Sequence, residues 1–99
     1  MPFRVNNQSL HSQHSLKCDD VLVFKYQQAE SSYLHFFIGK RYGNAIKRNL
    51  LKRRIRHLFK LFSQQLSPAG FCLSVFPIKK NISYEELRVC FALLTKKMI

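Results

Sequence analysis

Cationic side chains are the chemistry-bearing residues that this sequence concentrates most strongly. Nine of its seventeen Lys and Arg residues lie between Lys40 and Lys60, a stretch that contains no Asp or Glu. Guanidinium groups can bridge two phosphate oxygens, whereas a Lys ammonium acts as a point charge. A solvated helix face usually carries both signs of charge, because like charges three or four residues apart repel each other. The one-signed cluster therefore favours a polyanionic partner over simple exposure to solvent.

The spacing in this segment predicts a helix with one basic side. Leu51, Ile55, Leu58 and Phe62 recur at i, i+4, i+7 and i+11, which is typical of the apolar stripe of a helix, here over residues 44–65. With 100° per residue, the polar side chains opposite this stripe fall in an arc about 100° wide. This arc, called the basic arc below, contains Asn49, Lys52, Arg53, Arg56 and Lys60. Because the stripe must face a core, this arc is expected to point outward.

Two further residues of this helix carry specific expectations. Asn49 has an amide donor and acceptor among the cations, so it could contact a base edge or a 2′-hydroxyl group of RNA. Arg48 borders the apolar stripe, and bracing of the helix start is the alternative to an RNA contact for that residue. A short, rigid surface of this kind suits an RNA backbone better than a deep groove.

Other residue groups have weaker chemical patterns. His11, His14 and Cys18 could supply three metal ligands, but no fourth ligand lies nearby, so no metal site is expected. The pair Asp19-Asp20 before a strand is more typical of a turn or cap than of a Mg²⁺ site. No Ser/His/Asp or Cys/His set has a spacing that argues for catalysis, so no catalytic residue is assigned to the protein.

Composition narrows the class of protein. The net charge of +12 favours nucleic acid as the partner, with an anionic membrane surface as the second class. The 46% of apolar residues indicates a folded domain. No run of apolar residues is long enough for a membrane span or an export signal. The three cysteines, Cys18, Cys72 and Cys90, are odd in number and widely spaced, so no disulfide framework is expected and a reducing cytoplasm fits best. Cys72 lies in an apolar strand and Cys90 on an apolar helix face, so both are expected to be buried small apolar residues.

Three strands and two helices must position the basic arc within a single domain, residues 1–99. Residues 21–26, 33–38 and 71–76 are rich in β-branched and aromatic side chains, and Pro77 ends the third run. In the second run, Leu34, Phe36 and Ile38 share one face; His35 alternates with them and is either a plain surface residue or part of an RNA-facing surface. Ser83 and Glu86 form a capping box that starts a C-terminal helix. The polar residues 1–20 are expected to be loosely ordered, with at most one short helix.

A resemblance to a known family rests on residues 43–56, GNAIKRNLLKRRIR. This segment resembles the Arg-Asn-Arg motif region of the bacterial ribonuclease P protein component. The family pattern is met in register by Ala45, Arg48, Asn49, Lys52, Arg53 and Arg56. The resemblance implies an α+β fold, a two-layer α/β sandwich with a strand-strand-helix-strand-helix core and a left-handed β-α-β crossover. The general preference for such connections is the opposite, right-handed form.

The resemblance also implies a function. A protein of this family binds the catalytic RNA of ribonuclease P and the 5′ leader of precursor tRNA, assisting endonucleolytic removal of the leader to form the mature tRNA 5′ end. The chemistry belongs to the RNA subunit with Mg²⁺; the protein holds no cofactor, and one protein per RNA is expected. The candidate RNA-binding residues are Lys40, Arg41, Lys47, Arg48, Asn49, Lys52, Arg53, Arg56 and Lys60. Phe24 and Phe36 are the candidate leader-binding residues.

The chain departs from the family pattern at identifiable positions. Leu50 stands where the motif has its third residue, an Arg, and Lys47 and Arg54 are the nearest replacements. Phe76 stands where the family has an Arg, and Phe3 alone is available for an N-terminal Phe-x-x-x-Phe pattern. The alternative function is that of a ribosomal or other structural RNA-binding protein without a role in tRNA processing. A helix-turn-helix DNA binder is not expected, because strands flank the basic helix on both sides.

Overall fold

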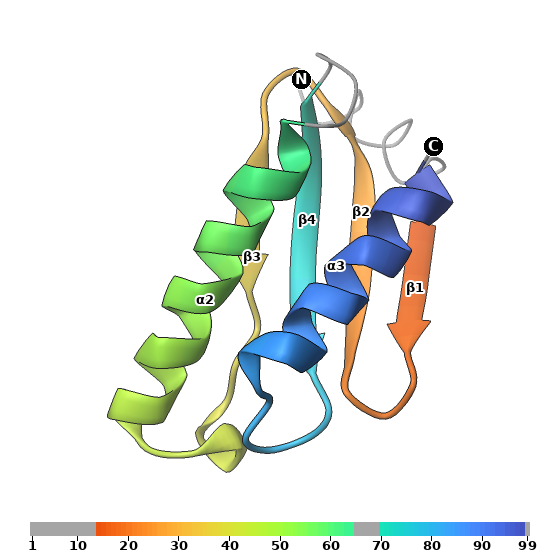
Figure 1. Cartoon of the computed structure of the whole chain (residues 1–99). Coiled ribbons are helices and arrows are strands. Elements are labelled where there is room, and N and C mark those ends of the chain that lie inside the picture. Colours follow the sequence, from red (N-terminus) through yellow and green to blue (C-terminus); the bar gives the residue numbers. More distant parts are fainter. Residues whose placement is uncertain (1–13, 65–69, 99) are drawn as a thin grey trace.

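The computed structural model describes residues 14–64 and 70–98, which form a four-stranded sheet with helices on one face (Figure 1). In chain order the elements are β1 (His14–Cys18), β2 (Leu22–Ala29), β3 (Tyr33–Phe36), the 3₁₀ turn η1 (Lys40–Tyr42), α2 (Ala45–Ser63), β4 (Gly70–Pro77) and α3 (Tyr84–Met98). The strand order is β1-β2-β4-β3, in which only the β3–β4 pair is parallel. The expected two-layer α+β sandwich is confirmed.

The helix α2 joins β3 to β4 through a left-handed crossover. In Figure 1, β3 and β4 both run downward, β4 lies to the right of β3, and α2 lies in front of the sheet. The general right-handed preference is therefore wrong for this chain, and the crossover implied by the family resemblance is confirmed. The physical reason lies in the shared core: with this strand order, a right-handed connection would place α2 on the face opposite α3, and their apolar stripes could not pack together.

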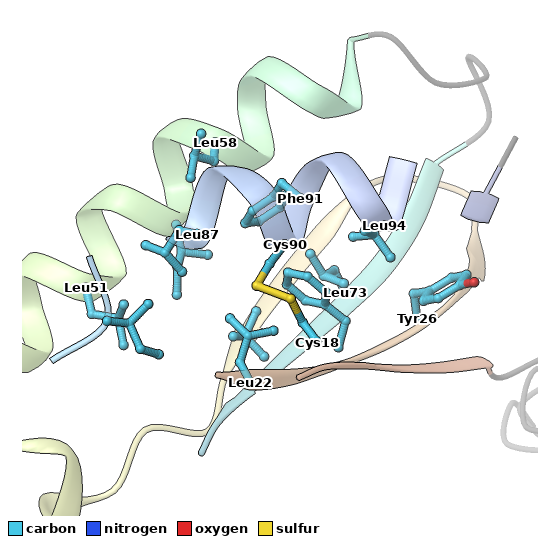
Figure 2. Packing of buried hydrophobic residues seen from close by; sticks show 14 of the residues in the cluster. Cys18, Leu22, Tyr26, Leu51, Leu58, Leu73, Leu87, Cys90, Phe91 and Leu94 are labelled. Atoms are coloured by element: carbon cyan, nitrogen blue, oxygen red, sulfur yellow. A yellow bond between two sulfur atoms is a disulfide. The ribbon is translucent and has the colours of Figure 1, made fainter. Parts of the chain in front are cut away.

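The core lies between the sheet and the two helices (Figure 2). Alternate residues of the central strands point into it, namely Leu22, Phe24 and Tyr26 of β2 and Phe71, Leu73 and Val75 of β4. The two helices complete it with Leu51, Ile55 and Leu58 of the predicted α2 stripe and with Leu87, Phe91 and Leu94 of α3, none of which is more than 2% exposed. Each large side chain buried in this way contributes roughly 1.5–3 kcal/mol, so the stripe holds α2 in one orientation.

The N-terminal prediction is partly wrong. Residues His14–Cys18 were expected to be loosely ordered but form β1, which pairs with β2 in the register Leu16↔Phe24. This strand forms because β2 offers it a free edge, and because the pleat turns Cys18 toward the core, where it is 3% exposed. The expected short helix, Phe3 and His11 lie outside the described residues.

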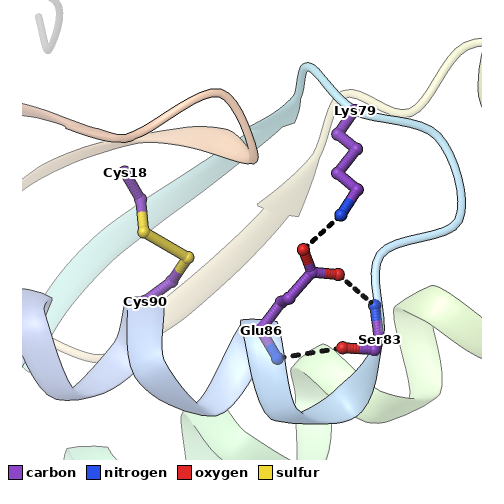
Figure 3. The surroundings of a disulfide bond; sticks show 5 residues. All are labelled: Cys18, Lys79, Ser83, Glu86 and Cys90. Carbon is purple, nitrogen blue, oxygen red and sulfur yellow. Dashed lines mark hydrogen bonds and ion pairs between the residues drawn. A yellow bond between two sulfur atoms is a disulfide. The ribbon is translucent and has the colours of Figure 1, made fainter.

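A disulfide joins β1 to α3, which corrects the expectation that the cysteines are unpaired (Figure 3). Cys18 and Cys90 are both buried, and their Cα atoms are 5.8 Å apart. Since 72 residues separate them in the chain, only the packing of α3 on the sheet brings them together. Cys72 is free and half-buried, and this burial raises the pKa of its thiol.

The predicted capping box at the start of α3 is confirmed (Figure 3). The Ser83 hydroxyl accepts from the Glu86 N–H at 3.1 Å, and the Glu86 carboxylate accepts from the Ser83 N–H at 2.9 Å. Lys79 forms an ion pair with the same carboxylate. Within residues 14–64 and 70–98, neither helix is long and apolar enough to cross a membrane.

Candidate nucleic-acid interface

The basic arc of α2 points away from the core, as its spacing predicts. Four of its members, Asn49, Arg53, Arg56 and Lys60, are exposed, and Lys52 is half-buried. On the other side of the helix, Leu51, Ile55 and Leu58 are fixed in the core. The helix itself lies over the edge strand β3 (Figure 1).

An aromatic ring of β3 supports two cations of the basic arc. The Lys52 Nζ atom lies 6.0 Å from the centroid of the Phe36 ring, and the Arg56 guanidinium carbon lies 5.3 Å from it. A cation within about 6 Å of a ring face is attracted to its electron density. Phe36 therefore holds these two positive groups along the edge of β3.

The charges of α2 remain uncompensated among the residues that the structure describes. Both ion pairs found there, Lys79–Glu86 and Arg88–Glu85, use carboxylates of α3. The sequence contains no acidic residue between Glu30 and Glu85. An anionic partner would consequently meet cations that have no internal competitor.

The start of α2 is fixed by short-range hydrogen bonds. Asn44 caps the helix, because its side-chain oxygen accepts from the Lys47 N–H at 2.9 Å. Arg48 is half-buried and donates to the Gly43 carbonyl at 3.2 Å, which fits the bracing alternative for this residue. Gly43 has φ 158° and ψ −170°, a conformation that is essentially restricted to glycine. Lys40 and Arg41 are exposed on η1 just before this cap.

The face of the sheet away from the helices, here called the open face, carries a stacked aromatic pair. The rings of Phe37 and Phe76 are 4.5 Å apart and nearly parallel, at 7°. The Lys25 Nζ atom lies 5.1 Å from the Phe76 ring centroid. His35 is exposed on the same face, 6.4 Å from Tyr33 between ring centroids. These groups combine flat rings with positive charge, a set that can stack and neutralise single-stranded nucleic acid.

The two leader-binding candidates chosen from the sequence do not lie on this open face. Phe24 is 0% exposed and packs edge-on against Phe91 at 5.0 Å, so no base can reach it. Phe36 lies on the helix face, beneath Lys52 and Arg56. The prediction for Phe24 is wrong because the strand pleat places it with Leu22 and Tyr26 in the core.

The alternation of side chains along a strand is the sequence signal that could have identified Phe37 and Phe76. Placing Leu34 and Phe36 on the core face necessarily puts Phe37 on the opposite face. Phe76 follows the buried Val75 of β4 and so shares that face. The stack itself depends on β3 pairing with β4 in a parallel register, which adjacent residues of the chain do not specify.

The part of the chain that the structure describes contains no group of three His, Cys, Asp or Glu side chains placed to hold a metal ion. Of the three ligand candidates in the sequence, Cys18 is bonded to Cys90 and His14 stacks on Tyr26 at 5.2 Å. His11 lies outside the described residues. The described members of this set therefore do not converge on one point.

Comparison with protein families gives one match that covers nearly the whole chain. The family model Ribonuclease P matches residues 6–98. The ribonuclease P protein component of Phytoplasma australiense is 35% identical over 80 residues, which span 78% of this chain and 70% of that protein. The corresponding protein of Thermotoga petrophila is 34% identical over 79 residues, spanning 80% and 66% of the two chains. For the Onion yellows phytoplasma protein, 33% identical over 75 residues, the shares are 71% and 53%.

Solved structures share the fold. The RNase P protein from Thermotoga maritima in complex with 1-(4-fluorophenyl)-2-thiourea superimposes with a TM-score of 0.72 at 23% identity, covering 100% of this chain and 99% of that one. The RNase P protein of Staphylococcus aureus gives a TM-score of 0.67 at 18% identity, covering 98% and 91%. The left-handed arrangement of β3, α2 and β4 thus occurs within a fold that is already known.

Proposed function

Because this chain belongs to the ribonuclease P protein family, we propose that it is the protein component of a ribonuclease P holoenzyme. It binds the catalytic RNA and the 5′ leader of precursor tRNA, and so assists the endonucleolytic cleavage that forms the mature tRNA 5′ end. The observation that carries this proposal is the motif register of residues 43–56, displayed on a helix between two parallel strands. No comparison favours the alternative of a ribosomal or other structural RNA-binding protein.

The basic arc is the surface that we assign to the catalytic RNA. Its support is the set of exposed, uncompensated cations on a helix that the core holds rigid. Arg53 and Arg56 would bridge phosphate oxygens, and Asn49 would contact a base edge or a 2′-hydroxyl. Lys40, Arg41 and Lys60 would extend the contact at the two ends of α2, while Arg48 mainly positions the helix start.

The open face of the sheet is the surface that we assign to the 5′ leader. Phe37 and Phe76 replace Phe24 and Phe36 in this role, because their rings lie on the open face. A base stacked on an aromatic side chain contributes about 1–3 kcal/mol with little dependence on sequence. Lys25 lies beside the Phe76 ring and would approach a leader phosphate.

Catalysis is assigned to the RNA subunit with Mg²⁺, one protein binding one RNA in the cytoplasm. The protein contributes binding energy and neutralises phosphate charge, which lowers the Mg²⁺ concentration that the complex requires. No protein side chain is assigned a role in bond cleavage.

Reconstitution tests this function. The protein is added to a ribonuclease P RNA and a precursor tRNA with a 5′ leader at low Mg²⁺, and the rate of leader release is measured. Faster release is expected, and the triple variant Lys52→Ala, Arg53→Ala, Arg56→Ala should lose most of the gain. The control is Lys96→Ala with Lys97→Ala, which removes two exposed charges from the last turn of α3 and should keep the gain. Equal release with and without the protein would refute the proposal.

A further inference from the structure

The disulfide between Cys18 and Cys90 is unexpected in a protein that is proposed to act in the cytoplasm. Both cysteines lie inside the hydrophobic core, at 3% and 1% exposure, although Cys18 belongs to an edge strand (Figure 2). Disulfides are rare in reducing compartments, and most of those that occur there are transient or redox-sensing. The bond is therefore a candidate for reversible reduction.

The strand β1 is attached to the core mainly through this bond. Of its side chains, Cys18 alone is buried, while Leu16 is half-buried. His14 is exposed and stacks on Tyr26. Because β1 lies at the edge of the sheet, it pairs with β2 alone. Elements with little buried apolar area are the first to open locally. Loss of the bond would leave β1 with its ladder to β2 and one half-buried leucine.

The other end of the bond belongs to a helix that has anchors of its own. The helix α3 buries Leu87, Phe91 and Leu94 in the core. Its first turn is closed by the capping box of Ser83 and Glu86 (Figure 3). Breaking the disulfide would therefore free β1 and leave α3 in place.

The third cysteine of the chain cannot exchange with this pair. Cys72 alternates along β4 with the buried Phe71 and Leu73, so its thiol lies on the open face. The disulfide lies on the opposite side of the sheet, among the core residues. The pair therefore has two covalent states, one closed and one with two thiols, and only an external agent converts them.

The strand that the bond fastens also carries a cation of the open face. Lys17 is exposed, and its partner Val23 pairs on its other side with Phe76. Since neighbouring strands are about 4.8 Å apart, the Cα atoms of Lys17 and Phe76 are separated by roughly 10 Å across the sheet. A nucleotide stacked on Phe76 would have its phosphate within reach of the Lys17 ammonium. Lys17 keeps this position only while β1 is paired with β2.

We propose that the Cys18–Cys90 disulfide is a reversible redox switch, which fastens β1 and Lys17 beside the leader surface when closed and releases them when reduced. The reductant is a cellular dithiol. One of its thiolates attacks a sulfur of the pair and breaks the S–S bond, and its second thiolate resolves the mixed disulfide. Two electrons and two protons pass to the cysteines, which become thiols, and the dithiol leaves as a disulfide. Exchange with an external disulfide restores the bond. The effect on the leader rests on the proposed function, whereas the switching of β1 does not.

Thiol counting on the full chain tests the switch itself. The protein is equilibrated at a series of ratios of reduced to oxidised dithiothreitol, quenched with acid, and labelled with a maleimide after denaturation. One labelled cysteine, Cys72, is expected at oxidising ratios and three at reducing ratios, with the same midpoint from either direction. A label count of one at every ratio, or of three at every ratio, would overturn the proposal.

Cross-strand NOEs measured by NMR locate the structural change. Reduction should weaken those between Leu16 and Phe24 by at least about half, because β1 opens, whereas those between Phe24 and Val75 persist. Cys18→Ser with Cys90→Ser should show the reduced pattern under both conditions, and Cys72→Ser should keep the wild-type response. Loss of both sets of NOEs would indicate general unfolding, and persistence of both would show that the bond does not hold β1. Either result contradicts the switch.

Leader binding by the reconstituted complex tests the link to function. Precursor tRNA should bind about threefold more weakly when the protein is reduced, with the slope of log K against log salt lower by about one charge, because Lys17 leaves the surface. Mature tRNA without a leader is the control and should bind equally in both states. Lys17→Gln should remove the difference. Equal binding of precursor tRNA in both states refutes the coupling. A complex that does not respond to the leader at all contradicts the proposed function instead, and the thiol count still decides the switch.

Discussion

The helices α2 and α3 pack on the same sheet but use charge in opposite ways. In α3, Glu85 and Glu86 pair with cations, a capping box closes the first turn, and Cys90 is bonded to β1. In α2, Asn44 caps the start, yet no cation has an acidic partner among the described residues. The helix α3 is therefore stabilised from within the protein, whereas α2 depends on its apolar stripe and leaves its charges for a partner.

The largest effect is expected from truncating the stripe that holds α2. Ile55 is 0% exposed, and Ile55→Ala should lower the free energy of unfolding by about 2–5 kcal/mol through lost transfer energy and a residual cavity. The measurement is denaturant unfolding. The exposed Ile46→Ala on the same helix serves as control and should change stability by less than about 0.5 kcal/mol. Similar losses for both variants would show that the stripe does not anchor α2.

Removing the disulfide between β1 and α3 should lower the free energy of unfolding somewhat less than Ile55→Ala does. The double variant Cys18→Ala, Cys90→Ala is expected to lower stability by about 2–4 kcal/mol, because the unfolded chain regains the entropy that the bond removed. Thermal unfolding with and without a reductant measures this difference. Cys72→Ala is the matched control and should keep the response to reductant. An unfolding temperature of the wild-type protein that does not change with reductant would contradict the bond between β1 and α3.

Charge removal from α2 should weaken RNA binding while hardly changing the fold. Arg53→Ala and Arg56→Ala should each weaken binding to the RNA subunit by about 1–2 kcal/mol and lower the salt slope by about one charge. Asn49→Ala should reduce affinity with little change in slope, since it is uncharged. Binding is measured over a series of salt concentrations. Unchanged slopes for both Arg variants would remove the basic arc from the interface.

The smallest effect concerns the pH dependence of the α3 cap. The hydrogen bond from Lys79, with that from the Ser83 N–H, lowers the pKa of Glu86 from its ordinary value of 4.5. The carboxylate therefore stabilises the fold fully above its unfolded-state pKa, and this contribution is lost as pH falls through the lower, folded-state pKa. Glu86→Gln should flatten the acid limb of a stability–pH curve, whereas Glu30→Gln, an exposed control, should leave it unchanged. The reverse pattern would show that the cap carries no linked proton.

The two surfaces also differ in how well the sequence predicted them. The basic arc needed only helical periodicity, so Asn49, Arg53 and Arg56 were placed outward correctly. The aromatic surface was misassigned to Phe24, because a strand shows which residues alternate but does not show which side is covered. For a similar reason β1 was not predicted, because residues 14–18 become a strand only by pairing with the free edge of β2.

By itself, the sequence determined the elements that depend on neighbouring residues: the stripe and basic arc of α2, the Ser83–Glu86 capping box and the one-signed charge that requires an anion. Tertiary structure alone decided the left-handed crossover, the bond between Cys18 and Cys90 and the stacking of Phe37 on Phe76. The physical reason is distance along the chain. Helical periodicity and caps act over three or four residues, whereas the covered side of a sheet is fixed by α2 and α3 packing together across the whole domain.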